Sequence, residues 1–175
     1  MIRIRNRLIR INNFFFDFHD FFESELGKLL FLSHKLYFMG FVYDEVKLIN
    51  AEDFGMARRC MLDQDDVRQI NVSVLVDSGA WMLTINENIQ SYLQLPFQRT
   101  DTGVTADGRR IECDVVGPVR VEWQNRDCYC SAMVLPGDSE PLLGAIPMED
   151  MDLAVLPKEG KLVGKHHPDY PVHRI

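Results

Sequence analysis

The chain has 175 residues, of which 46% are hydrophobic, and it carries a formal net charge of −7 at pH 7. This length suits one domain with its own core plus an appendage. The negative charge and the lack of a long lysine or arginine run argue against nucleic acid or an anionic membrane as the main partner, because both need clustered positive charge. We therefore expect the partner to be a protein, a peptide or a small molecule.

Residues 1–38 differ in composition from the rest of the chain, because eight of the eleven phenylalanines lie there. Asp17, Asp20 and Glu23 are among the charged residues that interrupt every apolar run, which excludes a secretory signal and a membrane span. Two interpretations stay open for this Phe-rich N-terminal extension. It is either an amphipathic helix over residues 14–38 that docks on the body or on a partner, or non-native upstream sequence ahead of a functional start at Met39.

From Met39 onward the pattern is mostly that of β-strands. Residues 41–50 alternate well enough for a first strand, and residues 51–67 form a polar, partly helical connection. A run of β-branched and aliphatic residues predicts a strand over 72–76, and 81–85 continues as a second extended segment.

The next elements are marked by caps and turns. Asn86 is typical of a helix N-cap, and the short helix that it opens stops before Pro96. Residues 103–116 predict a hairpin whose turn is Asp107-Gly108, a pair that tolerates positive φ. Two more strands are expected over 118–123 and 126–135, around a turn at Gln124-Asn125.

Residues 141–157 contain an apolar pair, a glycine, a short helix that Pro147 opens, and a strand. Many short strands with one or two short helices, and an acid at the end of a buried strand, predict an all-β fold. We expect a small closed β architecture with a site at a strand end.

Two motifs carry a family resemblance. The stretch VLVDSGA, which contains Asp77, resembles the first signature of the retropepsin-like aspartic proteases, and LLG at residues 142–144 resembles their second. Residues 39 to about 165 are more narrowly similar to small bacterial proteins of the clan AA aspartic proteases. The resemblance implies a retropepsin-like β-barrel over 39–165, followed by a C-terminal tail over 166–175.

The resemblance also implies roles for individual residues. Asp77 is the catalytic acid, which activates water together with a second carboxylate that shares its proton. Ser78, Gly79 and Ala80 support the active-site loop. Leu142, Leu143 and Gly144 form the segment that crosses beside this loop, and the hairpin tip at Ala106, Asp107 and Gly108 is the flap that closes over substrate.

One Asp-Ser-Gly motif supplies only one carboxylate. Asp101-Thr102-Gly103 spells a similar tripeptide, but it lies only 24 positions later and no buried strand precedes it. We interpret it as a polar turn that leads into the flap hairpin. The second carboxylate must then come from a second copy of the chain, which predicts a homodimer with a shared site on its two-fold axis.

The histidines and cysteines are the remaining candidate ligands, and we expect them to bind neither a metal nor another cofactor. His166, His167 and His173 lie in a proline-containing tail, where solvated side chains are commoner than metal ligands. The four cysteines contain no Cys-x-x-Cys pair and are interpreted as reduced structural thiols of a cytoplasmic protein: Cys60, Cys113, Cys128 and Cys130.

The leading hypothesis is an aspartic endopeptidase that acts on peptides or a specific protein. The alternative is a non-catalytic retropepsin-like module for dimerisation or peptide binding. Trp81, directly after the motif, is either a bulky obstacle to substrate or a buried anchor. A hydrolase that uses a single carboxylate is a third, less favoured alternative, because the paired-acid chemistry argues against it.

Overall fold

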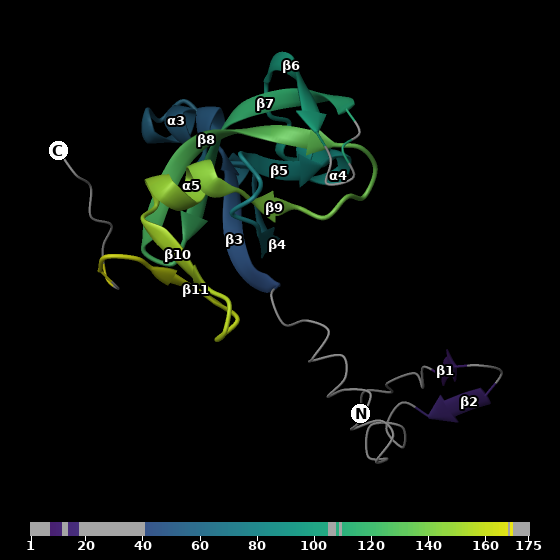
Figure 1. Ribbon diagram of the computed structural model, residues 1–175. Coiled ribbons are helices and arrows are strands. Elements are labelled where there is room, and N and C mark those ends of the chain that lie inside the picture. The colour runs from purple at the N-terminus through teal and green to yellow at the C-terminus, as the bar shows by residue number, and fades with distance from the viewer. Residues whose placement is uncertain are drawn as a thin grey trace, which may run out of the picture. The chain divides into compact units, whose positions relative to one another are not determined.

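The computed structural model describes residues 8–11, 14–17, 41–104, 108, 110–167 and 169 (Figure 1). The chain divides into two units, Met1–Gly40 and Phe41–Ile175. In the first unit, strands β1 (Leu8–Ile11) and β2 (Phe14–Asp17) form an antiparallel pair. Residues 14–17 are therefore a strand and not the start of a helix, and the rest of the 14–38 segment lies outside the described residues.

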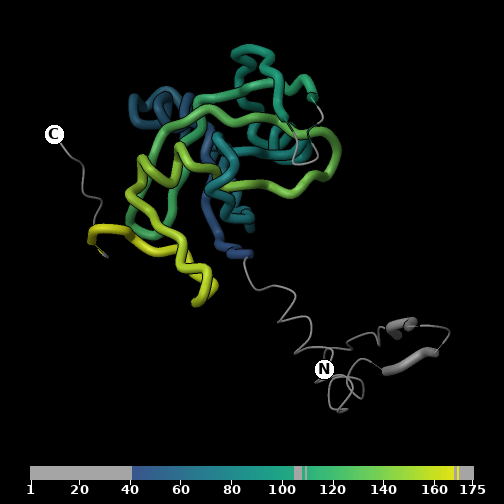
Figure 2. The backbone as a smooth tube through the Cα atoms, viewed as in Figure 1, coloured from purple at the N-terminus to yellow at the C-terminus, as the bar shows by residue number. Residues whose placement is uncertain are grey.

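The second unit is mostly β, as predicted, and its chain path can be followed in Figure 2. Its described residues contain three short α-helices where the sequence predicted one or two. The helices are α3 (Ala51–Arg58), α4 (Glu87–Leu93) and α5 (Ala145–Asp150), with one 3₁₀ turn, η1 (Gln64–Asp66). The strands are β3 (Val42–Asn50), β4 (Gln69–Val76), β5 (Leu83–Asn86), β6 (Phe97–Val104), β7 (Arg110–Trp123), β8 (Arg126–Leu135), β9 (Leu142–Leu143), β10 (Leu153–Leu156) and β11 (Lys161–Gly164).

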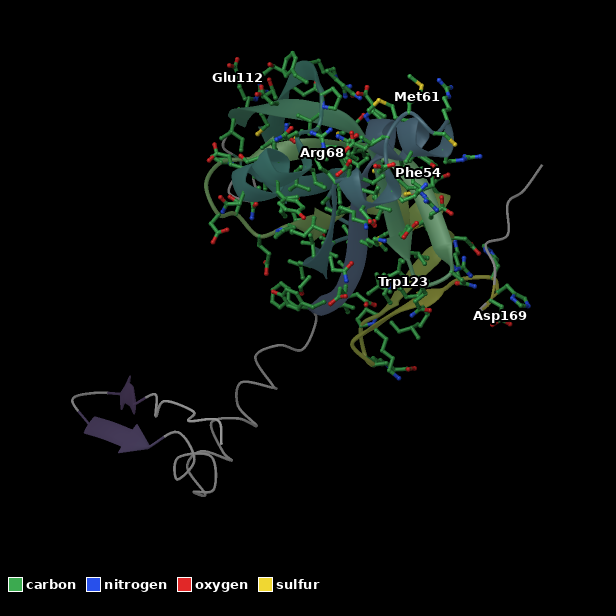
Figure 3. The ribbon with its side chains drawn as sticks, turned by 180° about the vertical axis from the view of Figure 1, so that it is seen from behind. Phe54, Met61, Arg68, Glu112, Trp123 and Asp169 are labelled. Carbon is green, nitrogen blue, oxygen red and sulfur yellow. The ribbon has the colours of Figure 1, made fainter. Side chains whose placement is uncertain are left out.

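Seven of these strands form one mixed sheet in the order β3-β4-β9-β5-β8-β7-β6. Strand β3 pairs with β4 and also with β7, so the hydrogen-bonded order returns to its first strand. Strand β7 runs the length of the sheet, with Glu112 toward one end and Trp123 at the other (Figure 3). Strands β10 and β11 form a separate antiparallel hairpin.

The core lies inside this curled sheet, because alternate side chains of each strand point to one face. In β3, Val42 and Val46 are buried between exposed or half-buried neighbours, and Leu48 begins a fully buried end of the strand. They pack with buried aliphatic residues of the other strands, and a smaller cluster of Ile49, Ala57 and Val67 lies beneath α3.

Helix α3 is fixed by two polar side chains. Asn50 caps its N-terminus by accepting from the amides of Glu52 and Asp53, which satisfies donors that a helix leaves free. The buried Asp53 carboxylate accepts from Arg68 Nε at 2.5 Å and from Arg68 Nη2 at 2.5 Å. These hydrogen bonds from Arg68 hold the pKa of Asp53 below its usual value. The start of β4, the strand that leads to Asp77, is thereby tied to α3.

Two element predictions are wrong in detail. The second strand of the hairpin expected over 103–116 and the strand expected over 118–123 are one strand, β7, with a bulge opposite β8 between Val116 and Val119. Proline has no backbone donor, and Pro118 is accommodated at this irregularity. Helix α5 begins at Ala145 after Gly144, so Pro147 is its third residue and not its first. A proline there costs no helical hydrogen bond, because the first-turn amides have no partner within the helix.

Candidate functional site

Asp77 lies directly after β4, where the chain turns sharply. The amide of Ala80 donates to the Asp77 carbonyl at 3.1 Å, and the amide of Gly79 donates to Asp77 Oδ1 at 2.9 Å. Asp77 is partly buried, whereas Ser78 and Gly79 are exposed. The loop is therefore held mainly by backbone hydrogen bonds, and the Asp77 carboxylate accepts one hydrogen bond from an amide of the loop.

A short strand from far along the chain fixes this loop in the sheet. Strand β9 lies between β4 and β5, with Leu143 opposite Val76 in a parallel pairing. The Asp77 amide donates to the Leu143 carbonyl at 3.1 Å, and the Leu142 amide donates to Thr84 Oγ1 at 3.0 Å. Leu143 is fully buried, so hydrophobic packing and hydrogen bonding both hold the base of the loop.

Gly144 lies where β9 passes closest to the Asp77 loop. A Cβ at this position would lie 2.9 Å from the Ala80 oxygen and closer still to the carbonyl of Met82, so no side chain fits. The next amides continue the contact, since Ala145 donates to the Ala80 carbonyl at 2.8 Å and Ile146 donates to the Trp81 carbonyl at 3.1 Å. Helix α5 thus begins directly on the loop.

The loop opens onto a cleft of about 890 Å³. One wall is the Asp77 loop with the residues that follow it, and the other is strand β6 with the adjoining parts of β7 and β8. The cleft combines carboxylates with a mainly apolar surface, which is typical of ligand-binding sites. Its lining comprises Asp77, Gly79, Ala80, Trp81, Met82, Thr84, Arg99, Asp101, Thr102, Gly103, Val104, Ile111, Met133, Leu135 and Leu142.

The predicted flap corresponds to the hairpin of β6 and β7, which pair up to Val104 and Arg110. Gly108 has a positive φ of 82°, a conformation that glycine adopts without strain. Ala106 and Asp107 lie outside the described residues. The structure thus brings Asp77, its loop and residues 142–144 together, and places the base of the hairpin on the opposite side of the cleft.

The interpretation of Asp101 as part of a turn is wrong. Asp101-Thr102-Gly103 lies within strand β6, and Asp101 pairs with Cys113 of β7. Its carboxylate faces the same cleft as Asp77 and accepts from Arg99 Nε at 2.8 Å. Sequence reasoning missed Arg99, although Arg99, Asp101 and Gly103 have the two-residue spacing that puts side chains on one face of a strand.

Two predictions about the residues near Asp77 can be compared with the structure. Trp81 is not a buried anchor, because 76% of its surface is exposed and it lines the cleft. Ser78 is predicted to support the active-site loop. It is exposed, and its hydroxyl makes no hydrogen bond to the residues that the structure describes.

The other predicted groups lie away from the cleft. His166 Nδ1 is 2.5 Å from Asp152 Oδ1, and the His167 carbonyl accepts from the buried Arg126. His173 lies outside the described residues. All four cysteines are free: Cys60 is exposed, Cys113 and Cys128 are buried, and Cys130 is half-buried. Within the described ranges no group of three or more His, Cys, Asp or Glu side chains could hold a metal ion.

Among the described residues, no helix is both long enough and apolar enough to cross a membrane. Neither the protein-family models nor the curated proteins compared with the chain match it.

Proposed function

We propose that the protein is a retropepsin-like aspartic endopeptidase that acts as a homodimer in the cytoplasm. The observation that carries this proposal is the clamped Asp77 loop. Asp77 lines a cleft of about 890 Å³, and the backbone of its loop is fixed by hydrogen bonds to Leu143 and Ala145. An acid placed on a preorganised loop, and not on a flexible surface turn, is what proton transfer to and from water requires.

The chemistry needs a second carboxylate. One ionised carboxylate takes a proton from water while the water attacks the peptide carbonyl, and a protonated one donates to the carbonyl oxygen. Two carboxylates a few ångströms apart share one proton because they cannot both ionise. A two-fold axis beside the exposed Ser78 and Gly79 would supply Asp77 from each chain. The outward Ser78 hydroxyl would then be available to the partner's loop.

Asp101 is an alternative source of the second carboxylate, because it lines the same cleft as Asp77 of the same chain. Two features disfavour it. It lies on a regular strand, where no amide of the described residues donates to its carboxylate, and its Oδ2 is already engaged by Arg99. A site within one chain and a site shared between chains differ in how activity depends on subunit mixing.

Subunit mixing with Asp77→Asn tests the proposal. The amide keeps the shape of the carboxylate but cannot take a proton from water, so the variant should assemble and hydrolyse nothing. After exchange with excess variant, the initial rate on a peptide library should fall with the square of the wild-type fraction. A linear fall would contradict the shared site and would favour a site within one chain.

Two controls complete the experiment. Asp114→Asn makes the same charge change at an exposed position of β7, outside the cleft, and should leave the rate unchanged at every mixing ratio. A transition-state inhibitor of aspartic proteases should abolish the wild-type rate. If the wild-type dimer binds peptides but cleaves none, the proposed catalysis is wrong and the chain is a peptide-binding module.

A further inference from the structure

The cleft wall opposite Asp77 carries an ion pair that the proposed hydrolysis does not use. Arg99 Nε and Asp101 Oδ2 lie 2.8 Å apart, with 52% and 40% of the two side chains exposed. Both residues line the cleft. Exposed ion pairs contribute little to stability, so the fold itself gives little reason for a charged pair at this position.

The geometry of β6 turns this pair toward substrate. Arg99, Asp101 and Gly103 follow one another at every second position, which places them on one face of the strand. A Cβ on Gly103 would meet Met133 Sδ at 3.5 Å and Ile111 Cγ1 at 3.6 Å, so this face rests on apolar side chains of β8 and β7. The absent side chain of Gly103 leaves room in the cleft beside Asp101.

On the opposite face of β6, Thr102 and Val104 still line the cleft, but Thr100 does not. Thr100 Oγ1 donates to Asp114 Oδ1 at 3.3 Å on the neighbouring strand, and neither residue lines the cleft. The chain therefore has two aspartates near each other on paired strands, one facing the cleft and one facing away. This arrangement provides a matched pair for mutation.

The formal charges of the described cleft residues favour a cation. The lining contains two carboxylates, Asp77 and Asp101, and one guanidinium, Arg99, which leaves one negative charge in excess. Asp101 Oδ2 is engaged by Arg99, whereas Oδ1 accepts no hydrogen bond from the residues that the structure describes. A carboxylate has lone pairs for several donors, so Asp101 can accept from an ammonium or guanidinium group while it keeps Arg99.

We infer that Asp101 selects peptides carrying a lysine or arginine side chain near the scissile bond, next to apolar residues that fill the rest of the cleft. This inference rests on the proposed function. The basic head would pair with Asp101, and its aliphatic stem would lie over Gly103 and the Met133 and Ile111 side chains. Arg99 holds Asp101 in place and limits the preference, because it competes for the same carboxylate.

The test compares short peptides that differ only by lysine or norleucine, since norleucine keeps the aliphatic stem without the charge. The probes carry a central Leu-Leu pair in an otherwise uncharged sequence, and the variable residue occupies each flanking position in turn. The wild type should show kcat/KM about fivefold to tenfold higher for lysine at one position or more, as expected for a partly exposed charge pair. High salt should reduce this ratio.

Three variants locate the effect. Asp101→Asn should bring the lysine-to-norleucine ratio to about one, and Asp114→Asn should leave the ratio at its wild-type value, because only Asp101 faces the cleft. Arg99→Gln should raise the ratio. A wild-type ratio near one at every position, a preference for glutamate over lysine, or a ratio that survives Asp101→Asn would overturn the inference.

Binding separates this inference from the proposed catalysis. Trp81 is exposed in the cleft and Trp123 is only 3% exposed, so a change in tryptophan emission on adding peptide reports chiefly on the cleft. The Asp77→Asn variant should bind the lysine peptide more tightly than the norleucine peptide. If no form cleaves peptides but this binding preference is present and requires Asp101, the endopeptidase proposal fails and the inference stands. If peptides are cleaved without a preference for lysine, the inference about Asp101 fails and the endopeptidase proposal stands.

Discussion

The tripeptides Asp77-Ser78-Gly79 and Asp101-Thr102-Gly103 are nearly the same in sequence but differ in structure. The first is a tight loop after β4, and the second is a regular part of strand β6. The loop is fixed by β9, which inserts beside it, whereas the strand is fixed by its register with β7. The surrounding chain, and not the tripeptide, decides which aspartate is held on a rigid loop and which is presented on a strand.

The glycines near the two acids should show the largest difference. Gly144→Ala forces a Cβ against the Met82 and Ala80 carbonyls, which are backbone atoms and cannot move away cheaply. We expect a loss of at least about 4 kcal/mol in the free energy of unfolding, or failure to fold. Gly103→Ala meets its nearest neighbour at an ordinary 3.5 Å and should change stability by less than about 1 kcal/mol. Urea denaturation of both variants measures the contrast, and similar losses would contradict the crossing geometry.

Two aspartate–arginine pairs give the next contrast. The Asp53 side chain is 2% exposed and is held by Arg68, whereas Asp101 is 40% exposed beside Arg99. Asp53→Asn should cost about 2–3 kcal/mol, because it removes the charge that compensates Arg68, which is itself partly exposed. Asp101→Asn should cost less than about 0.5 kcal/mol.

The Asp53–Arg68 pair makes the stability of the fold depend on pH. Because Arg68 lowers the pKa of Asp53 in the folded chain, the stabilisation is complete above the unfolded value of about 4. It is lost as pH falls from about 4 through the lower folded pKa. The difference in unfolding free energy between wild type and Asp53→Asn should therefore shrink below about pH 4. A difference that stays constant to lower pH would show that the pair does not stabilise through the charge of Asp53.

The smallest expected effect concerns Asp77 itself. Asp77→Asn keeps an oxygen that can accept from the Gly79 amide, so stability should change by less than about 0.5 kcal/mol. Asp77→Ala loses that acceptor and should cost about 1 kcal/mol. Thermal unfolding of both variants distinguishes them. If Asp77→Asn proved the less stable, the hydrogen bond to Gly79 would not be what the side chain contributes to folding.

The sequence predicted the elements whose signals are local. Asn86 caps α4 by accepting from the Ile89 amide, and the helix ends at Leu93, before Pro96. Strand β3 and the hairpin of β6 and β7 were also located. In these cases a cap, a turn or an alternating pattern lies within a few residues of the element that it defines.

The features that were missed depend on partners far along the chain. Most residues of β6 are exposed, so the strand has no alternating apolar pattern, and the sequence indicates a turn at Asp101-Thr102-Gly103 instead. The side chain of Arg126 is fully buried because the carbonyls of Met151, Asp152 and His167 accept from it. A sequence does not reveal such acceptors. The place of Asp101 in the cleft was missed for the same reason.

The position of β9 has a consequence for the order of folding. Strands β4 and β5 are near neighbours in the sequence, but the segment that hydrogen-bonds between them comes from much later in the chain. Closing such a long loop costs chain entropy before its contacts are gained, so local hairpins form more readily than this central pairing. A chain that has formed only its local hairpins contains every residue of the Asp77 loop, but β9 is not yet in place to hold that loop. The acid is therefore brought to its final geometry only when the fold is complete, and an unfinished chain carries no assembled site.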